Sequence, residues 1–174
     1  MKNHTTILFR WIFGILAIWL RLVLPTQAVA QQISSFPGAV GFGSAVQGAV
    51  YVSGTIHYGG NVYHVTNLND SGPGSFRTGV SHGGNIVVFD VGGSIQNLSP
   101  VSVTSNVDIE GQTAPGGIQV FGSETSFYGS SNIICRFMHF RDGTLDPNYP
   151  GANGTDSHTN AANMGDTSNI IMDH

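Results

Sequence analysis

The sequence predicts an all-β protein, built as a β-solenoid in which successive coils of chain stack in parallel. Beyond the N-terminal leader, short β-branched runs are bounded by Gly, Asn and Pro, and no stretch shows a convincing helical period of apolar residues. An asparagine followed by an apolar strand start recurs at intervals of 24, 21, 26 and 37 residues. Such intervals fit one strand per coil with one enlarged loop. A β-sandwich of closely spaced strands stays open as an alternative.

Residues 1–30 are expected to be a secretory signal peptide. Lys2 and Arg10 lead into the uncharged run WIFGILAIWL, and the small-residue sequence AVA ends at Ala30. This order gives a basic region, an apolar region and a cleavage site. The apolar run is shorter than the roughly 20 residues that span a bilayer. We therefore expect a secreted or periplasmic protein with no stable membrane span after cleavage, and an uncleaved anchor is the alternative.

Cleavage would leave a strongly acidic chain, because only Arg77, Arg136 and Arg141 remain against ten acidic residues. A net charge near −7 (3 − 10) without a basic stripe argues against nucleic acid as a partner. It fits a protein that holds a cation. The single cysteine, Cys135, excludes an intrachain disulfide and lies in an apolar alternation typical of a buried, unreactive thiol.

Five strand starts follow in order along the chain, and their asparagines are expected to stack from coil to coil. The turn clusters NLNDSGPGSFR at 67–77 and GQTAPGG at 111–117 separate some of them. The run at 132–140 is apolar on both faces, as strands of parallel sheets are. The predicted strand starts are NVYHV at Asn61, NIVVFDV at Asn85, NVDIE at Asn106, NIICRFMHF at Asn132 and NIIMDH at Asn169.

The segment 141–168 is polar, rich in Gly, Pro, Asn and Asp, and reads as a long loop of the kind that carries binding or catalysis. Half of the acidic residues lie between Asp142 and Asp173, with no positive side chain after Arg141. A hard cation with oxygen ligands would relieve their repulsion. Turn-forming Asp residues in a solvated loop are the alternative.

Other chemistries find little support in the sequence. The histidines lack HxH or HExxH spacing, which disfavours zinc. Asp173 and His174 are neighbours on a predicted strand and are expected to face opposite sides. A Ser-His-Asp site has no G-x-S-x-G to support it. A glycoside hydrolase would need paired carboxylates, which the lone Asp173 on its strand does not provide.

Six ordered blocks together resemble the N-terminal half of the secreted pectate-lyase family. The resemblance implies a right-handed, single-stranded parallel β-helix, incomplete at the C-terminus, whose first coils span residues 31–174. It also implies calcium as the cofactor, polygalacturonate as the substrate, cleavage by β-elimination and a monomeric complete protein. The blocks are FPGAVGFGS (36–44), VYHVTNLNDSGPGSFR (62–77), IVVFDVGGSI (86–95), GQTAPGGI (111–118), NIICRFMHFRDGT (132–144) and SNIIMDH (168–174).

The chain departs from the family pattern at the expected calcium site. The family's Asp-Ala pair, about nine residues before the asparagine of the last block, is Asn160-Ala161 here. Asp146 and Asp156 from the loop, together with Asp173, are the predicted metal ligands in its place.

The family's catalytic arginine lies after the last matched block, and neither Arg136 nor Arg141 corresponds to it. We therefore expect no catalytic residue within this chain, which would be an inactive fragment of a polysaccharide lyase. A non-catalytic β-helix used for surface attachment or glycan binding is the alternative, and the neutral Asn160 favours it.

Overall fold

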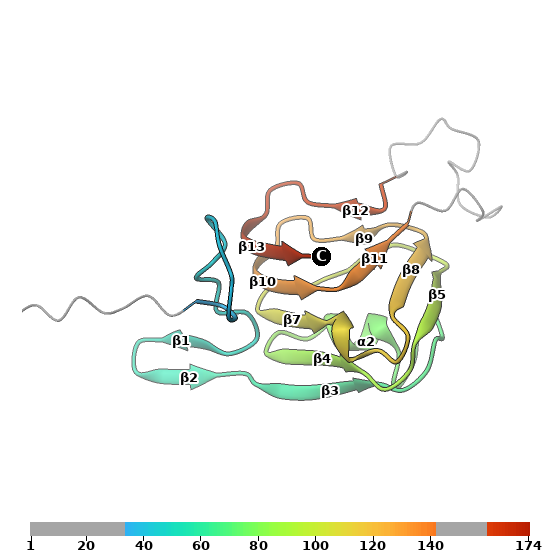
Figure 1. Ribbon diagram of the computed structural model, residues 1–174, viewed down its shortest axis with the longest axis horizontal. Coiled ribbons are helices and arrows are strands. Elements are labelled where there is room, and N and C mark those ends of the chain that lie inside the picture. Colours follow the sequence, from blue (N-terminus) through green and yellow to red (C-terminus); the bar gives the residue numbers. More distant parts are fainter. Residues whose placement is uncertain (1–33, 142–159) are drawn as a thin grey trace, which may run out of the picture. The chain divides into compact units, whose positions relative to one another are not determined.

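The computed structural model describes residues 34–141 and 160–174, and these residues form coils of parallel strands (Figure 1). The predicted signal peptide at 1–30 lies outside the described residues. Within them, no helix is both long and apolar enough to cross a membrane. The strands are β1 (Tyr51–Ser53), β2 (Ile56–Tyr58), β3 (Asn61–Val65), β4 (Asn85–Phe89), β5 (Gly93–Asn97), β6 (Val101–Ser102), β7 (Val107–Glu110), β8 (Ile118–Gly122), β9 (Thr125–Ser126), β10 (Ser131–Arg136), β11 (Met138–Phe140), β12 (Ala162–Asn163) and β13 (Ser168–Asp173).

Three parallel sheets run along the stack of coils. Sheet 1 has the order β13-β10-β7-β4-β3, sheet 2 the order β11-β8-β5, and sheet 3 the order β12-β9-β6. The three coils that begin with β4, β7 and β10 each contribute one strand to each sheet, whereas β3 is followed by a helix and then by β4. β1 and β2 form a separate antiparallel hairpin that the sequence analysis did not predict. The predicted parallel β-helix is confirmed.

The register of sheet 1 builds the core from columns of like residues. Ile109, Cys135 and Met172 face one another across β7, β10 and β13. Cys135 is buried, and this burial raises the pKa of its thiol, in keeping with the predicted structural role. The other buried hydrophobic residues of the core are Val65, Phe76, Val80, Val87, Phe89, Ile95, Val101, Val103, Val107, Ala114, Ile118, Val120, Phe127, Ile133 and Met138.

A short helix, α2 (Phe76–Val80), packs against β3, β4 and β6 and buries Phe76 and Val80 in this core. Ser75 caps it by accepting a hydrogen bond from the Thr78 N–H. Phe76 is fully buried and stacks on Phe89, with ring centroids 6.0 Å apart. The sequence analysis took residues 67–77 as a turn cluster and missed this helix, because five residues are too few for an apolar period to show.

The five strand-start asparagines occupy two different columns. Asn61 and Asn85 pair in register, and the buried Asn85 donates to the Gly79 carbonyl at 2.8 Å. Asn106, Asn132 and Asn169 belong to the other column and have positive φ angles of 62°, 59° and 50°. Asparagine adopts this left-handed backbone more readily than most residues. The side chains stack at one rung, where Asn132 Nδ2 donates to Asn106 Oδ1 at 2.7 Å, so the predicted ladder is confirmed there.

The chain before the hairpin, residues 34–50, forms an N-terminal strap across the outer face of sheet 1. Asn132 Oδ1 accepts the N–H groups of Gln47 and Gly48 at 2.9 and 3.1 Å, and its Nδ2 donates to the Gly48 carbonyl at 3.0 Å. Asp108 Oδ1 accepts the Ala49 N–H at 3.0 Å. Gly48 has φ +62°, and a Cβ there would overlap Asp108 Oδ1. Two polar side chains of sheet 1 therefore hold the strap by its backbone.

The loop predicted at 141–168 includes residues at its C-terminal end that form strands in the structure. Residues 142–159 lie outside the described part of the chain, but Ala162 and Asn163 form β12, which pairs with Thr125 and Ser126 of β9. β13 already begins at Ser168. A two-residue strand in a polar context has no alternation to detect, because its identity comes only from the coil it stacks upon.

Replacing Asn132 with Ala should destabilise the protein by about 2–4 kcal/mol. The variant loses the bonds to the strap and to Asn106, and Ala is less suited to the left-handed backbone. Urea unfolding of the wild type and the variant measures the change. Asn69→Ala, at an exposed turn position, is the control and should cost less than about 0.5 kcal/mol. Equal losses in both variants would contradict the role given to Asn132.

Asp108 should make folding stability fall as the pH rises. Burial raises the pKa of Asp108 from 3.8 to about 6. The hydrogen bond from the Ala49 N–H lowers this pKa, and the charge of Glu110 raises it, but both effects are smaller than that of burial. The folded state therefore holds this proton more tightly than the unfolded state, and the stabilisation is lost between about pH 4 and about pH 7. The loss amounts to at most about 3 kcal/mol.

Asp108→Asn keeps an oxygen for the Ala49 N–H but does not titrate. The difference in unfolding free energy between this variant and the wild type, measured at about pH 4.5 and about pH 7.5, isolates the contribution of Asp108. The variant should gain relative to the wild type at the higher pH. A difference that does not change with pH would contradict the account.

Candidate functional site

The predicted ligand Asp173 lies at the end of β13, opposite Arg136 of β10. Arg136 NH2 and Nε lie 3.0 and 3.1 Å from Asp173 Oδ2, and both side chains are largely buried, at 22% and 24% exposed. The Arg136 guanidinium also lies 4.0 Å above the Phe36 ring of the strap, in cation–π geometry. These contacts tie the strap to β10 and β13.

His174 does not face away from Asp173 as predicted. Its Nδ1 lies 2.9 Å from Asp173 Oδ1, and its ring stacks on Phe137 with centroids 4.4 Å apart. The reason is the backbone, because His174 follows the strand with φ 70° and strand alternation no longer applies to it. Both oxygens of Asp173 are therefore engaged by protein groups.

The described residues do not assemble a calcium site. No group of three or more His, Cys, Asp or Glu side chains in residues 34–141 and 160–174 could hold a metal ion. The predicted ligands Asp146 and Asp156 lie outside these ranges. Asn160, at the position of the expected acid, is exposed and stands two residues before β12. The role of Asp173 as a metal ligand stays a prediction, and its contacts with Arg136 and His174 favour a structural role.

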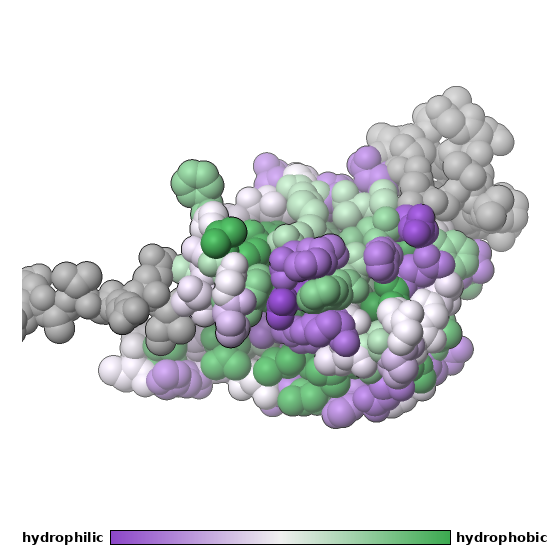
Figure 2. Space-filling view, in the orientation of Figure 1, coloured by the Kyte–Doolittle hydropathy of each residue, from purple (hydrophilic) through white to green (hydrophobic). Residues whose placement is uncertain are grey.

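Asp166 has a different neighbour from Asp173. Its hydrogen bond to Tyr128, and then its charge, raise the pKa of that phenol. Asp166 and Asp173, the two acids of the predicted group that the structure describes, therefore have different partners. Figure 2 shows hydrophilic side chains over the ends of β10 and β13 and a hydrophobic area over β3.

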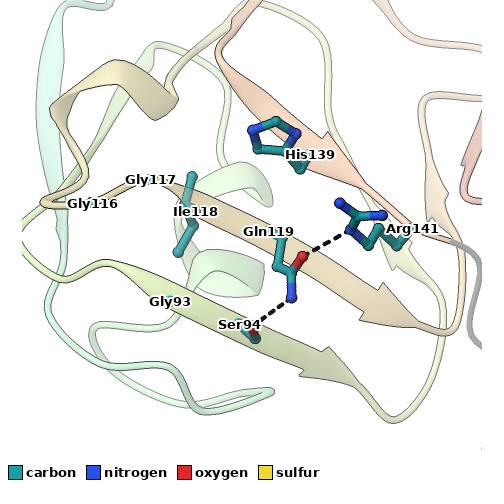
Figure 3. A pocket seen from close by; sticks show the side chains of 8 residues that line it. All are labelled: Gly93, Ser94, Gly116, Gly117, Ile118, Gln119, His139 and Arg141. Atoms are coloured by element: carbon teal, nitrogen blue, oxygen red, sulfur yellow. Dashed lines mark hydrogen bonds between the residues drawn. The ribbon is translucent and has the colours of Figure 1, made fainter.

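A polar hollow lies on the outer face of sheet 2 and was not predicted (Figure 3). Ser94, Gln119 and His139 occupy equivalent positions on β5, β8 and β11. Gln119 donates to Ser94 Oγ at 2.6 Å and accepts from Arg141 Nε at 2.9 Å. The hollow has a volume of about 330 Å³, and its lining residues are Gly93, Ser94, Gly116, Gly117, Ile118, Gln119, His139 and Arg141.

Two glycine pairs are the sequence signal beside the hollow, but aligning them does not give its register. Gly92-Gly93 and Gly116-Gly117 are offset by one residue, because Gly93 lies opposite Ile118 and Ser94 opposite Gln119. The Gly93 N–H donates to the Gly117 carbonyl at 2.9 Å, which confirms that these turns stack. His139 lies opposite Gln119 in the next coil, where no glycine pair precedes the strand.

Comparisons with known proteins connect this fold to a family. The chain is 43% identical over 141 residues to a protein of Aspergillus flavus named probable pectate lyase C, covering 80% of this chain and 30% of the relative. A protein of the same name from Emericella nidulans is 40% identical over 153 residues, covering 87% of this chain and 32% of the relative. The predicted resemblance to pectate lyases is confirmed, and the chain spans about 30% of the length of the curated relatives it matches.

A solved structure supports the fold independently. The major cedar-pollen allergen jun a 1 superposes with a TM-score of 0.58 at 22% identity, covering 78% of this chain and 41% of the allergen. No family model matches the chain. At this identity the structural likeness bears on the fold alone.

Asp173→Asn tests whether Asp173 acts through Arg136 or through a metal. Loss of the ion pair should cost about 1–2 kcal/mol, because Arg136 is left largely buried with a weaker partner. The melting temperature should fall by the same amount with millimolar calcium and with chelator.

Asp90→Asn is the matched control, because its pair with His64 is half exposed and its loss should cost less than about 0.5 kcal/mol. A calcium-induced rise in melting temperature that the wild type shows and Asp173→Asn lacks would identify Asp173 as a ligand.

Proposed function

We propose that this chain is part of a secreted polysaccharide lyase that cleaves polygalacturonate or pectate by β-elimination. The observation that carries the proposal is 40–43% identity, over most of the chain, to proteins named probable pectate lyase C. Because the chain spans about 30% of those relatives, the activity is proposed for the longer protein of which it would be a part.

The β-elimination reaction requires a base and a group that neutralises the uronate carboxylate. A base removes the C5 proton of a uronate unit, the C4–oxygen bond breaks, and an unsaturated sugar remains. The neighbouring carboxylate must be neutralised for C5 to become acidic, which a bound calcium ion does when it is present. The described residues do not gather a calcium-binding set, so its ligands would be Asp146 and Asp156 together with residues of the longer protein.

Arg77 and Arg136 are poorly placed to act as the base. Arg77 donates to Asp70 Oδ1 at 2.5 Å and to the Pro100 carbonyl at 2.7 Å, so it fastens one turn to another. Arg136 is paired with Asp173. A carboxylate partner favours the protonated guanidinium, which is the opposite of what a base needs. Arg141 has the neutral Gln119 as a partner, but it does not correspond to the family's catalytic arginine. We therefore propose that the residues of this chain alone do not perform the elimination.

A non-catalytic, glycan-binding β-helix is the second candidate. Asn160 at the position of the expected acid favours it, as do the protein contacts that occupy both oxygens of Asp173. The two functions share the fold and the acidic polymer but differ in whether a bond is broken.

An activity assay separates the two candidates. The purified 174-residue chain, incubated with polygalacturonate and calcium, should give no rise in the ultraviolet absorbance of unsaturated products. The longer protein should give a steady rise that chelator abolishes. Turnover by the short chain would overturn its predicted inactivity, and an inactive but polymer-binding long protein would favour the binding module.

A further inference from the structure

We infer that the outer face of sheet 2 is a calcium-independent binding site for a uronate unit of an acidic saccharide, with Arg141 as the carboxylate-binding group. The choice of saccharide rests on the proposed function. The site itself rests on three observations: the shape of the hollow, the fixed orientation of its polar side chains, and the sign of its charge.

The shape comes from paired glycines above a flat parallel sheet. Gly116 and Gly117 have φ angles of +77° and +91°, and no atom lies within 4 Å of where a Cβ would stand on either. The turn therefore leaves open space beside Gln119 and His139. The volume of about 330 Å³ is at the small end for ligand sites, which suits a saccharide unit better than a folded partner.

Three polar side chains of the hollow are joined by hydrogen bonds before any ligand arrives. Ser94, Gln119 and Arg141 form one hydrogen-bonded row across three coils (Figure 3). Because Gln119 Oε1 accepts from Arg141 Nε, the orientation of the guanidinium is fixed by a neutral group. A preorganised guanidinium loses little entropy on binding, and its planar fork matches a carboxylate.

The charge of the hollow is opposite to that of the chain. Its lining holds Arg141 and His139, and none of the lining residues within 34–141 and 160–174 is a carboxylate. A positive site on an acidic protein is suited to the carboxylate of an acidic sugar, and the polar groups of Ser94 and Gln119 are suited to its hydroxyls.

This site differs from the predicted calcium site in the group that it uses to bind an acidic sugar. It takes the charge of the sugar directly by a guanidinium, whereas a lyase site places a cation between two sets of carboxylates. It would therefore hold an acidic polymer on the protein whether or not calcium is present.

Isothermal titration calorimetry of the purified chain with trigalacturonate, in a buffer that contains EDTA, tests the inference. The wild type should bind, and Arg141→Gln, which keeps polar bulk but loses the charge, should bind at least tenfold more weakly. Arg141→Lys should show an intermediate loss, because it keeps the charge without the fork. His82→Gln, at an exposed position outside the hollow, should bind like the wild type.

Three outcomes would overturn the inference: no binding by the wild type in EDTA, equal binding by Arg141→Gln, or equal affinity for the neutral trisaccharide maltotriose. If Arg141→Gln does not fold, NMR shifts of the wild type decide instead, and trigalacturonate must then perturb the side chains of Gln119, His139 and Arg141. Since no bond is broken in this titration, an inactive long protein would refute the proposed function and leave this result unchanged.

Discussion

In-register parallel pairing in sheet 1 is the constraint on which the rest of the structure depends. Ile133 lies opposite Val107 on one side and Ile170 on the other, so residues 26 and 37 positions apart share one apolar column. A slip by one residue would turn each column from the core to the outer face. A left-handed asparagine comes directly before each residue of this column, and the hydrogen bond between Asn106 and Asn132 links two of these asparagines.

The same register determines which polar side chains lie beside one another on the outer faces of the sheets. On sheet 1 it brings Asp173 to Arg136 and lets Asn132 and Asp108 hold the strap, so these polar groups serve the fold. On sheet 2 it aligns Ser94 with Gln119, and Gln119 accepts a hydrogen bond from Arg141, which follows β11 in the next coil. Side chains at equivalent positions on neighbouring coils therefore hold the strap on the outer face of sheet 1 and line the hollow on the outer face of sheet 2.

The fold was predictable because coil repetition leaves a trace in the sequence, whereas much of the site was not. The asparagine starts located β3, β4, β7, β10 and β13, and apolar residues on both faces of 132–140 indicated stacking. The strap, α2 and β12 left no such trace, because the first is held through backbone groups and the other two are very short. The spacing of the acids in the sequence grouped Asp173 with the acids of the loop. In the structure, β13 pairs with β10, and this register places Asp173 beside Arg136, with which it forms an ion pair.

Nuclear Overhauser effects between core methyl groups test the register most directly. Neighbouring parallel strands lie about 4.8 Å apart, so methyl groups that share a column are close enough to give strong effects. The account predicts such effects from Ile133 to both Val107 and Ile170. If Ile133 contacts only one of them, or contacts residues shifted by one position, the stacked-coil register is wrong and the hollow on sheet 2 has no basis.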